Sequence, residues 1–300
     1  MKRVIALGFF DGVHIGHGAL LEKTKQRAAE LEALPSVLSF DIHPDTLVLG
    51  KEVPLITDTT ARKEIINRCY GIENVIFIHF SKSLMSMPWE EFAASIVSEL
   101  EAVHIVCGHD FTFGNRGEGK AELLKRWCEE RSIGCDIIPA VKKDGQIVSS
   151  THIRDLISSG RIEEANSFLG HPHCVSDTVH SGYHIGHSLG APTINMYFGD
   201  GVIVPKYGVY ATKVVLENGE EYGAVSNVGV RPTFGSGNKV NIESHLLDFS
   251  GNLYNKPARI DFYSFIREER KFSGPDELSG QIQKDIEDTK KYFELHSNRS

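Results

Sequence analysis

The hydrophobic period of this chain changes halfway along its length, and that change limits the folds open to it. In the first half, short apolar runs alternate with segments of helical spacing, an order typical of parallel βαβ units. The runs cover residues 4–7, 36–40, 74–80, 104–107 and 135–139. The first helix is expected over residues 16–34, ended by Pro35. The first half therefore predicts a doubly wound, Rossmann-like α/β sheet.

The second half contains strand patterns with turn signals such as Glu217-Asn218-Gly219 between them. The expected strands are residues 209–216, 222–228, 240–247 and 258–266. Because no helical pattern interrupts them, the strands indicate a small antiparallel barrel or sandwich, and of the two we predict the β-barrel. A terminal helix is expected over residues 275–295, with Pro275 in its first turn.

A length of 300 residues fits two domains of ordinary size. Two short helices, residues 151–159 and 162–169, are expected to close the first half. We therefore predict a first domain over residues 1–170 and a second over residues 171–300, with the boundary near residues 170–173.

Charge and cysteine usage narrow the class of protein. The formal net charge is −8, which argues against a general nucleic-acid binder, and no apolar run approaches the length of a membrane span. Five scattered cysteines without a CxxC pair fit a reducing cytoplasm. His171-Pro172-His173-Cys174 is too tightly spaced for a usual zinc site, so we interpret it as a surface linker.

The segment from Gly8 to His17 (GFFDGVHIGH) follows the first expected strand and opens the first expected helix. A strand-to-helix turn exposes backbone N–H groups at the positive end of the helix dipole, which favours phosphate. Gly12 and Gly16 would let a phosphate approach the backbone. His14 and His17 could both reach charge on a transferred phosphoryl group. This His-x-Gly-His turn resembles the signature of nucleotidylyltransferases, although a glycine-rich turn with two incidental histidines is the alternative.

A second segment, Ser149-Ser150-Thr151-His152-Ile153-Arg154, precedes an expected helix. Taken alone it is an ordinary N-terminal cap. In nucleotidylyltransferases, such a hydroxyl-rich turn faces the His-x-Gly-His turn, and its arginine grips triphosphate oxygens. The two segments together are stronger evidence than either one.

Over nearly its whole length the chain resembles the bacterial bifunctional riboflavin kinase/FMN adenylyltransferase (FAD synthetase) family. The resemblance rests on the two segments above and on further ordered matches. These are Phe40-Asp41-Ile42-His43-Pro44, Gly108-His109-Asp110-Phe111, Gly190-Ala191-Pro192-Thr193-Ile194-Asn195, Asn227-Val228-Gly229-Val230-Arg231-Pro232-Thr233, Glu243-Ser244-His245 and Phe265-Ile266-Arg267.

For the first domain, the resemblance implies an FMN adenylyltransferase. His14, His17 and Arg154 are the implied catalytic residues. The implied nucleotide- and flavin-binding residues of this domain are Gly8, Phe10, Asp11, Gly12, Gly16, His43, Asp110, Phe111, Ser149, Ser150 and Thr151.

For the second domain, the resemblance implies a riboflavin kinase with Glu243 as catalytic base and Arg267 beside the flavin. Thr193 and Asn195 would hold Mg²⁺ and ATP phosphates. The remaining implied binding residues are Gly182, Gly186, Gly190 and Pro192. Taken as isolated segments, Glu243 and Thr193 are better explained as a solvated strand carboxylate and an ordinary strand entry.

Two departures from the family pattern fall in the kinase glycine loop. Asp177 replaces a glycine, and His187 replaces an arginine, so a permanent charge and a bidentate donor are lost. Both changes should weaken ATP binding.

We therefore expect an enzyme that converts riboflavin to FMN and FMN to FAD, using ATP and Mg²⁺. Three alternatives stay open: an FMN adenylyltransferase with an impaired kinase half, a non-catalytic flavin or nucleotide sensor, and a nucleotidylyltransferase with another acceptor. The expected partners of the protein are small molecules, and we expect no binding to nucleic acid or to membranes. A homo-oligomer stays an open alternative.

Overall fold

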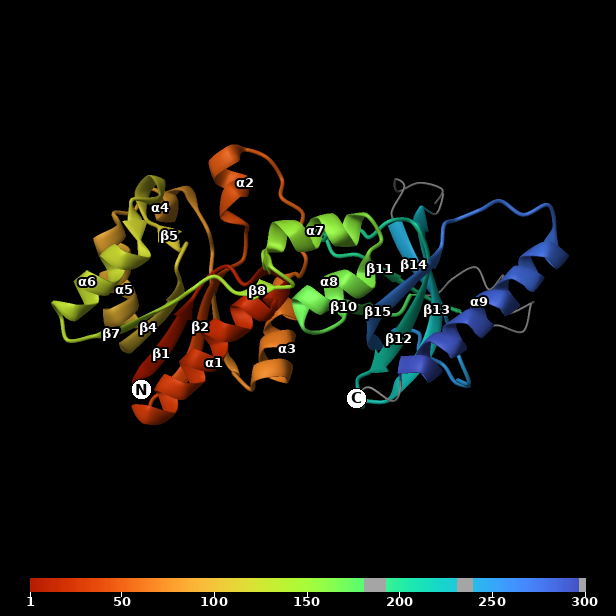
Figure 1. The fold of residues 1–300 in the computed structure, drawn as a ribbon, viewed down its shortest axis with the longest axis horizontal. Coiled ribbons are helices and arrows are strands. Elements are labelled where there is room, and N and C mark those ends of the chain that lie inside the picture. The colour runs from red at the N-terminus through yellow and green to blue at the C-terminus, as the bar shows by residue number, and fades with distance from the viewer. Residues whose placement is uncertain (181–192, 231–239, 297–300) are drawn as a thin grey trace. The chain divides into compact units, whose positions relative to one another are not determined.

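The structure is a computed structural model that describes residues 1–180, 193–230 and 240–296, and it divides into two compact units (Figure 1). The first unit is Met1–Ser150 and the second is Thr151–Ser300. The division falls after the first residue of α7 (Ser150–Ser158) and before α8 (Ile162–Leu169), two helices that the sequence pattern assigned to the first domain.

The first unit is built on a parallel sheet with strand order β3-β2-β1-β4-β7. The strands are β1 (Arg3–Leu7), β2 (Leu34–Phe40), β3 (Asn74–Ile78), β4 (Ala102–Gly108) and β7 (Gly134–Ile138). The strand order reverses at β1, where the chain crosses from one half of the sheet to the other. This topology confirms the predicted doubly wound α/β sheet.

Helices cover both faces of this sheet (Figure 1). Ile5 and Leu7 join one hydrophobic core with α5 (Trp89–Glu99) and α6 (Ala121–Glu129). Val4 and Ala6, which alternate with them, are fully buried on the opposite face. On that side α1 (Ile15–Glu30) contacts β1, β2 and β4.

The remaining elements of the first unit are short connections apart from one helix. They are η1 (Asp11–Val13), α2 (Pro44–Leu49), α3 (Thr59–Tyr70), α4 (Lys82–Met85), β5 (Thr112–Phe113), η2 (Asn115–Gly117), β6 (Gly119–Lys120), β8 (Lys142–Lys143) and β9 (Gln146–Ile147). Helix α3 contacts both α1 and η1, and this contact brings it beneath the turn that follows β1.

The first helix ends four residues earlier than the sequence predicts. It ends at Glu30, where Glu32 takes a left-handed φ of 48° and the Ala33 N–H donates to Ala28 O at 2.9 Å. Pro35 lies inside β2, opposite Val4, rather than at the end of the helix. The local turn ends the helix before the proline is reached.

The second unit is an antiparallel sheet with strand order β10-β15-β12-β13-β14-β11. The strands are β10 (His173–Thr178), β11 (Thr193–Tyr197), β12 (Gly208–Leu216), β13 (Glu221–Val230), β14 (Val240–Leu246) and β15 (Pro257–Arg267). Just beyond β10, the His180 N–H donates to Asn195 O of β11 at 2.8 Å. This bridge joins the two outer edges, so the sheet curls into the predicted small barrel.

Among the described residues, two helices pack against the barrel. Helix α8 contacts β10 and β15. The side-chain amide of Asn166 on this helix bonds to both strands: it accepts from His173 N of β10 and donates to Phe262 O of β15, each at 2.8 Å. Helix α9 (Pro275–His296) contacts β12, β13 and β15 and confirms the predicted terminal helix.

The interpretation of residues 171–174 as a surface linker is wrong. His173 is 1% exposed and Cys174 is 4% exposed, because both begin β10 and pair with β15. Burial lowers the pKa of His173 to about 3, with His171 contributing further, so its ring stays neutral.

None of the helices in the described ranges is both long and apolar enough to cross a membrane. The five cysteines all lie within those ranges, and none of them forms a disulfide.

Candidate active sites

The turn between β1 and α1 has a left-handed backbone at several positions. Phe10 has φ 56°, Gly12 has φ 75° and Val13 has φ 43°. Only glycine adopts such angles without strain, so the two non-glycine residues must be held by their surroundings. Both are fully buried, and their side chains anchor the turn from below.

His14 and His17 lie together at the start of α1. His14 is the N-cap residue, and its Nδ1 accepts the backbone N–H of His17 at 3.1 Å. That bond leaves the proton of a neutral His14 ring on Nε2. The two rings stack, with centroids 3.6 Å apart and an interplanar angle of 8°. The structure thus brings together both predicted catalytic histidines of this unit.

The His17 ring is held in its neutral form. Burial lowers its pKa well below 6.5, and the nearby His14 and Arg62 lower it further. Its position in the first helical turn also disfavours positive charge. Among the described residues, its buried Nδ1 has no hydrogen-bond partner. A neutral imidazole here can donate one N–H to an anion without carrying a charge itself.

Asp11 is 1% exposed and shapes the turn from within. Its carboxylate accepts from Ile56 N at 2.9 Å and Thr57 N at 3.0 Å, and Gly12 N donates to Thr57 Oγ1 at 2.9 Å. Ser150 Oγ donates to Asp11 O at 3.0 Å, which brings this member of the second predicted segment to the turn. Asp11 is therefore a residue that positions the loop.

Two glycines of the turn leave room for aromatic rings. A Cβ on Gly16 would lie 3.1 Å from the His14 ring, and one on Gly8 would lie 3.0 Å from the Phe10 ring. Either substitution would push a ring of the site out of place. The requirement for glycine at these two positions is thus steric.

Three other predicted residues of this unit lie on loops that follow strands. His43 caps α2, accepting Asp45 N at 3.2 Å, and its ring meets Phe9 edge-on at 4.6 Å. Phe111 stacks on Phe113 at 5.2 Å, and the Asp110 side chain is 83% exposed. Because β2 and β4 flank β1, these loops follow the same edge of the sheet as the histidine turn.

The second predicted segment spans the division between the units. Ser149 and Ser150 belong to the first unit, whereas Thr151 and Arg154 continue α7 in the second. The approach of Thr151 and Arg154 to the histidines therefore stays a prediction.

In the second unit, Thr193 and Glu243 meet across adjacent strands. Thr193 Oγ1 donates to Glu243 Oε1 at 3.0 Å, and Asn195 pairs directly opposite Glu243 in the β11–β14 register. Asn195 is 1% exposed, and its Oδ1 accepts from Asn241 Nδ2 at 3.2 Å. Alternation along the strands places all four side chains on one face. Asn241, which sequence reasoning missed, thereby orients a predicted metal ligand.

These side chains fit an Mg²⁺ ion bound mainly through nucleotide phosphates. Such ions take oxygen ligands and often only one or two from protein, and Thr193 and Asn195 both offer oxygen. The described residues contain no group of three histidine, cysteine or acidic side chains suited to holding a metal by themselves.

Arg267 is occupied by an ion pair. Its Nη2 lies 2.7 Å from Asp285 Oδ2 and its Nε lies 2.9 Å from Asp285 Oδ1. This bidentate pair ties β15 to α9, and whether Arg267 also reaches a flavin stays a prediction.

The substitution at Asp177 has a structural explanation. Its carboxylate accepts Tyr197 N at 2.9 Å and lies 3.2 Å from His180 Nε2. The negative charge is thus engaged beside the strand bridge. His187 and the predicted binding residues Gly182, Gly186, Gly190 and Pro192 lie outside the described residues.

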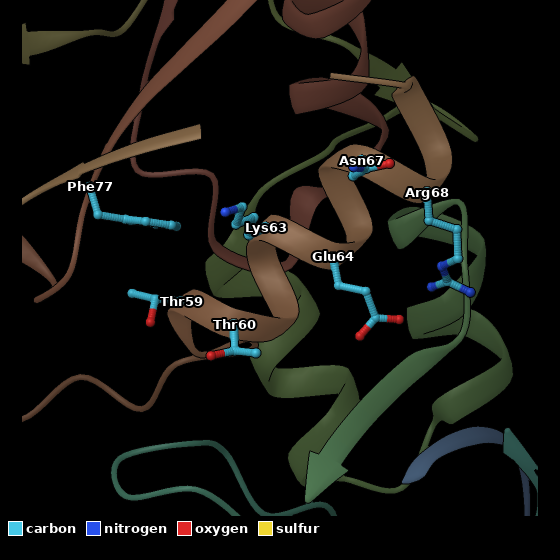
Figure 2. A pocket seen from close by; sticks show the side chains of 7 residues that line it. All are labelled: Thr59, Thr60, Lys63, Glu64, Asn67, Arg68 and Phe77. Atoms are coloured by element: carbon cyan, nitrogen blue, oxygen red, sulfur yellow. The ribbon is translucent and has the colours of Figure 1, made fainter. Parts of the chain in front are cut away.

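A surface hollow of about 520 Å³ lies on the outer side of α3 (Figure 2). It is lined by Thr59, Thr60, Lys63, Glu64, Asn67, Arg68 and Phe77. None of these residues belongs to the histidine turn, so the hollow is separate from the candidate site.

Sequence reasoning missed one buried residue beneath the histidine turn. Arg62, on the inner side of α3, is 0% exposed and donates to Phe9 O at 2.9 Å. An arginine in an amphipathic helix is normally a surface residue, so its residue type carried no signal.

Family comparisons match each half of the chain separately. The sequence model of FAD synthetase matches residues 1–152, and that of riboflavin kinase matches residues 169–293. A bifunctional riboflavin kinase/FMN adenylyltransferase of Listeria monocytogenes is 34% identical over 98% of this chain and 93% of its own length. The protein of that name from Escherichia coli K12 is 30% identical over 97% of this chain and 93% of its own.

A solved structure agrees over nearly the whole fold. The crystal structure described as a macrolide-efflux protein from Streptococcus pneumoniae has a TM-score of 0.85 and 30% identity, covering 96% of this chain and 94% of its own. The matches to both family models and to full-length relatives confirm the resemblance found in the sequence. This chain belongs to the family of bifunctional riboflavin kinases/FMN adenylyltransferases.

Proposed function

We propose that this chain phosphorylates riboflavin with ATP to give FMN, and then transfers AMP from ATP to FMN to give FAD and pyrophosphate. The observation that carries the proposal is the separate match of each half to one of the two activities. We place the boundary between the two catalytic domains at residues 170/171.

In adenylyl transfer, a phosphate oxygen of FMN attacks the α-phosphorus of ATP, and the bond to the bridging oxygen breaks to release pyrophosphate. The neutral His17 ring and His14 donate N–H groups to the charge that builds up on the phosphate oxygens, and Arg154 grips the triphosphate. Gly12 and Gly16, without side chains, let the same phosphates approach the backbone at the start of the helix.

Of the other predicted binding residues of this domain, some hold the histidine turn in place and others would contact the nucleotide or the flavin. Phe10 and Asp11 hold the turn from beneath, and Gly8 keeps space for the Phe10 ring. His43, Asp110 and Phe111 lie on the loops where the nucleotide and flavin would be bound. Ser149, Ser150 and Thr151 complete the cradle.

In riboflavin phosphorylation, the primary hydroxyl of the ribityl chain attacks the γ-phosphorus of ATP, and ADP leaves. Glu243 accepts the hydroxyl proton. Thr193 and Asn195 hold Mg²⁺, which neutralises phosphate charge when bound. Family membership further suggests that Gly182, Gly186, Gly190 and Pro192 bind the ATP phosphates and that Arg267 contacts the flavin.

The alternative of a silent kinase half rests on Asp177 and His187. The engaged carboxylate of Asp177 weakens that alternative, because its charge is bound to Tyr197 N and lies near His180. The sensor alternative is disfavoured because the chain retains Glu243, whose carboxylate is oriented by Thr193, together with the complete His-x-Gly-His turn.

We also propose a cytoplasmic location, since five cysteines without a disulfide suit a reducing compartment. The partners of the protein in the two proposed reactions are small molecules. Its net charge of −8 disfavours binding to nucleic acid.

A product assay tests the proposal. Purified protein is incubated with ATP, Mg²⁺ and either riboflavin or FMN, and the flavins are separated by chromatography. FMN and FAD from riboflavin are expected, with His17→Ala losing only FAD and Glu243→Ala losing FMN formation. FAD from added FMN without any product from riboflavin would support the single-activity alternative instead.

A further inference from the structure

We propose that Arg62 is a positioning residue for adenylyl transfer: its guanidinium fixes the loops around the histidine turn in the geometry that the reaction needs. The inference rests on the proposed function of the first domain. Arg62 lies beneath the turn, and its role is argued from its contacts with the chain.

One guanidinium joins three separate segments of the first unit. Nη1 donates to Phe9 O and Phe40 O, each at 2.9 Å, and to Ser39 Oγ at 3.0 Å. Nη2 donates to Thr57 O at 3.2 Å. These partners lie after β1, at the end of β2 and just before α3. The Arg62 side chain bonds to all three of these segments, so its guanidinium constrains their mutual positions.

A second set of bonds completes the framework. Thr57, held by Arg62 through its carbonyl, donates its N–H to Asp11 and accepts Gly12 N on its hydroxyl. Ser39 Oγ also donates to Phe9 O at 2.8 Å. Every connection leads to the residues immediately before His14. A shift of the guanidinium would therefore move the turn on which both histidines are mounted.

The charge on Arg62 has no carboxylate partner within ion-pair distance among the described residues. Burial lowers the pKa of Arg62 to about 10, so the group is still a cation at neutral pH. It stacks over the Phe9 ring at 4.3 Å, and Phe9 in turn contacts His43. The carboxylates of Asp11, Asp58 and Asp41 stabilise this buried cation through space and partly offset the cost of its burial.

Lysine cannot replace this arrangement. An ammonium group offers three donors from one point, whereas the four acceptors around Arg62 are reached by two nitrogens of a planar fork. Retaining the charge alone should therefore fail to restore the rate.

The test compares Arg62→Lys and Arg62→Met with Lys63→Met, a matched change at the next, exposed position of α3. Full-length proteins are assayed for FAD formation from FMN, for FMN formation from riboflavin, and for the number of FMN binding sites per chain by titration calorimetry. We expect both Arg62 variants to lose about 100-fold in kcat for FAD, because misplaced reacting groups cost that much. The riboflavin phosphorylation rate and the number of sites should stay within twofold, and Lys63→Met should match the parent.

Two results would overturn the inference. One is an Arg62→Lys protein that makes FAD within twofold of the parent rate. The other is a loss of binding sites in proportion to the lost rate, which would mean that Arg62 only keeps the unit folded. If the Arg62 variants fail to fold, Ser39→Ala is the second test, because it removes a hydroxyl that bonds to both Arg62 and Phe9 O and leaves the guanidinium in place. An unchanged kcat for FAD formation in this variant would contradict the inference. A parent protein that makes no FAD from FMN would instead refute the proposed function.

Discussion

Replacing Glu243 by glutamine separates its chemical role from its structural one. In the structure, Glu243 Oε1 accepts the Thr193 hydroxyl at 3.0 Å. A glutamine amide oxygen accepts the same bond, so the strands β11 and β14 keep their side-chain contact. The amide cannot accept the proton of the attacking hydroxyl. A general base contributes about 10²–10⁴-fold, which at 1.36 kcal/mol per tenfold corresponds to a barrier increase of about 2.7 to 5.4 kcal/mol.

The assay is FMN formation from riboflavin at saturating ATP, with FAD formation from added FMN as an internal control on the same protein. We expect the kinase kcat of Glu243→Gln to fall at least 100-fold, while FAD formation and the thermal midpoint stay unchanged. Glu221→Gln, an exposed change on β13, should leave both rates intact. A Glu243→Gln protein with a kinase rate within threefold of the parent would refute the assignment of Glu243 as the base.

Three further outcomes follow from particular contacts. Gly16→Ala places a Cβ about 3.1 Å from the His14 ring, so FAD formation should fall about tenfold or more without loss of helix stability; an unchanged rate would mean that the ring position is unimportant. Asp285→Asn leaves the 21%-exposed side chain of Arg267 without its ion-pair partner and should cost about 3 kcal/mol in denaturant unfolding; a loss below 1 kcal/mol would contradict this. The hydrogen bond from Arg27 lowers the pKa of Asp136 below 3.8, so the stability it contributes is present above that pH and lost as the pH falls further. The difference in thermal midpoint between the parent and Asp136→Asn should therefore shrink as the pH falls from 5 toward 2, and a difference that grows would contradict the sign.

Both architectures could be predicted from the hydrophobic period because burial enforces it. Parallel strands such as β4, buried on both faces, are continuous apolar runs, and the strands of the barrel are bounded by turn residues. The short strand β10 was missed, because His173 and Cys174 are not typical strand residues and their burial depends on pairing with β15. The end of α1 was misplaced for a similar reason: a left-handed turn at Glu32, which no residue type signals, ends the helix before Pro35.

The candidate site could be predicted where the chemistry is local. His14 and His17 are three residues apart on one turn, so sequence spacing alone brings them together. Residues that act across the fold were harder to predict. Arg62 and Asn241 serve the sites through neighbours from other strands, and no short motif contains them. The hydrogen bond from Tyr197 N to the Asp177 carboxylate depends on the bridge that closes the barrel. The strand pattern in the sequence did not reveal that bridge.

The central claim is that one chain uses ATP in two different ways, and labelled ATP tests it most directly. The protein is incubated with riboflavin, Mg²⁺ and ATP carrying ³²P at either the α or the γ position, and the flavins are separated and counted. The account predicts γ-label in both FMN and FAD, and α-label in FAD alone. Absence of α-label from every flavin would contradict the adenylyl transfer, and absence of γ-label from FMN would contradict the kinase.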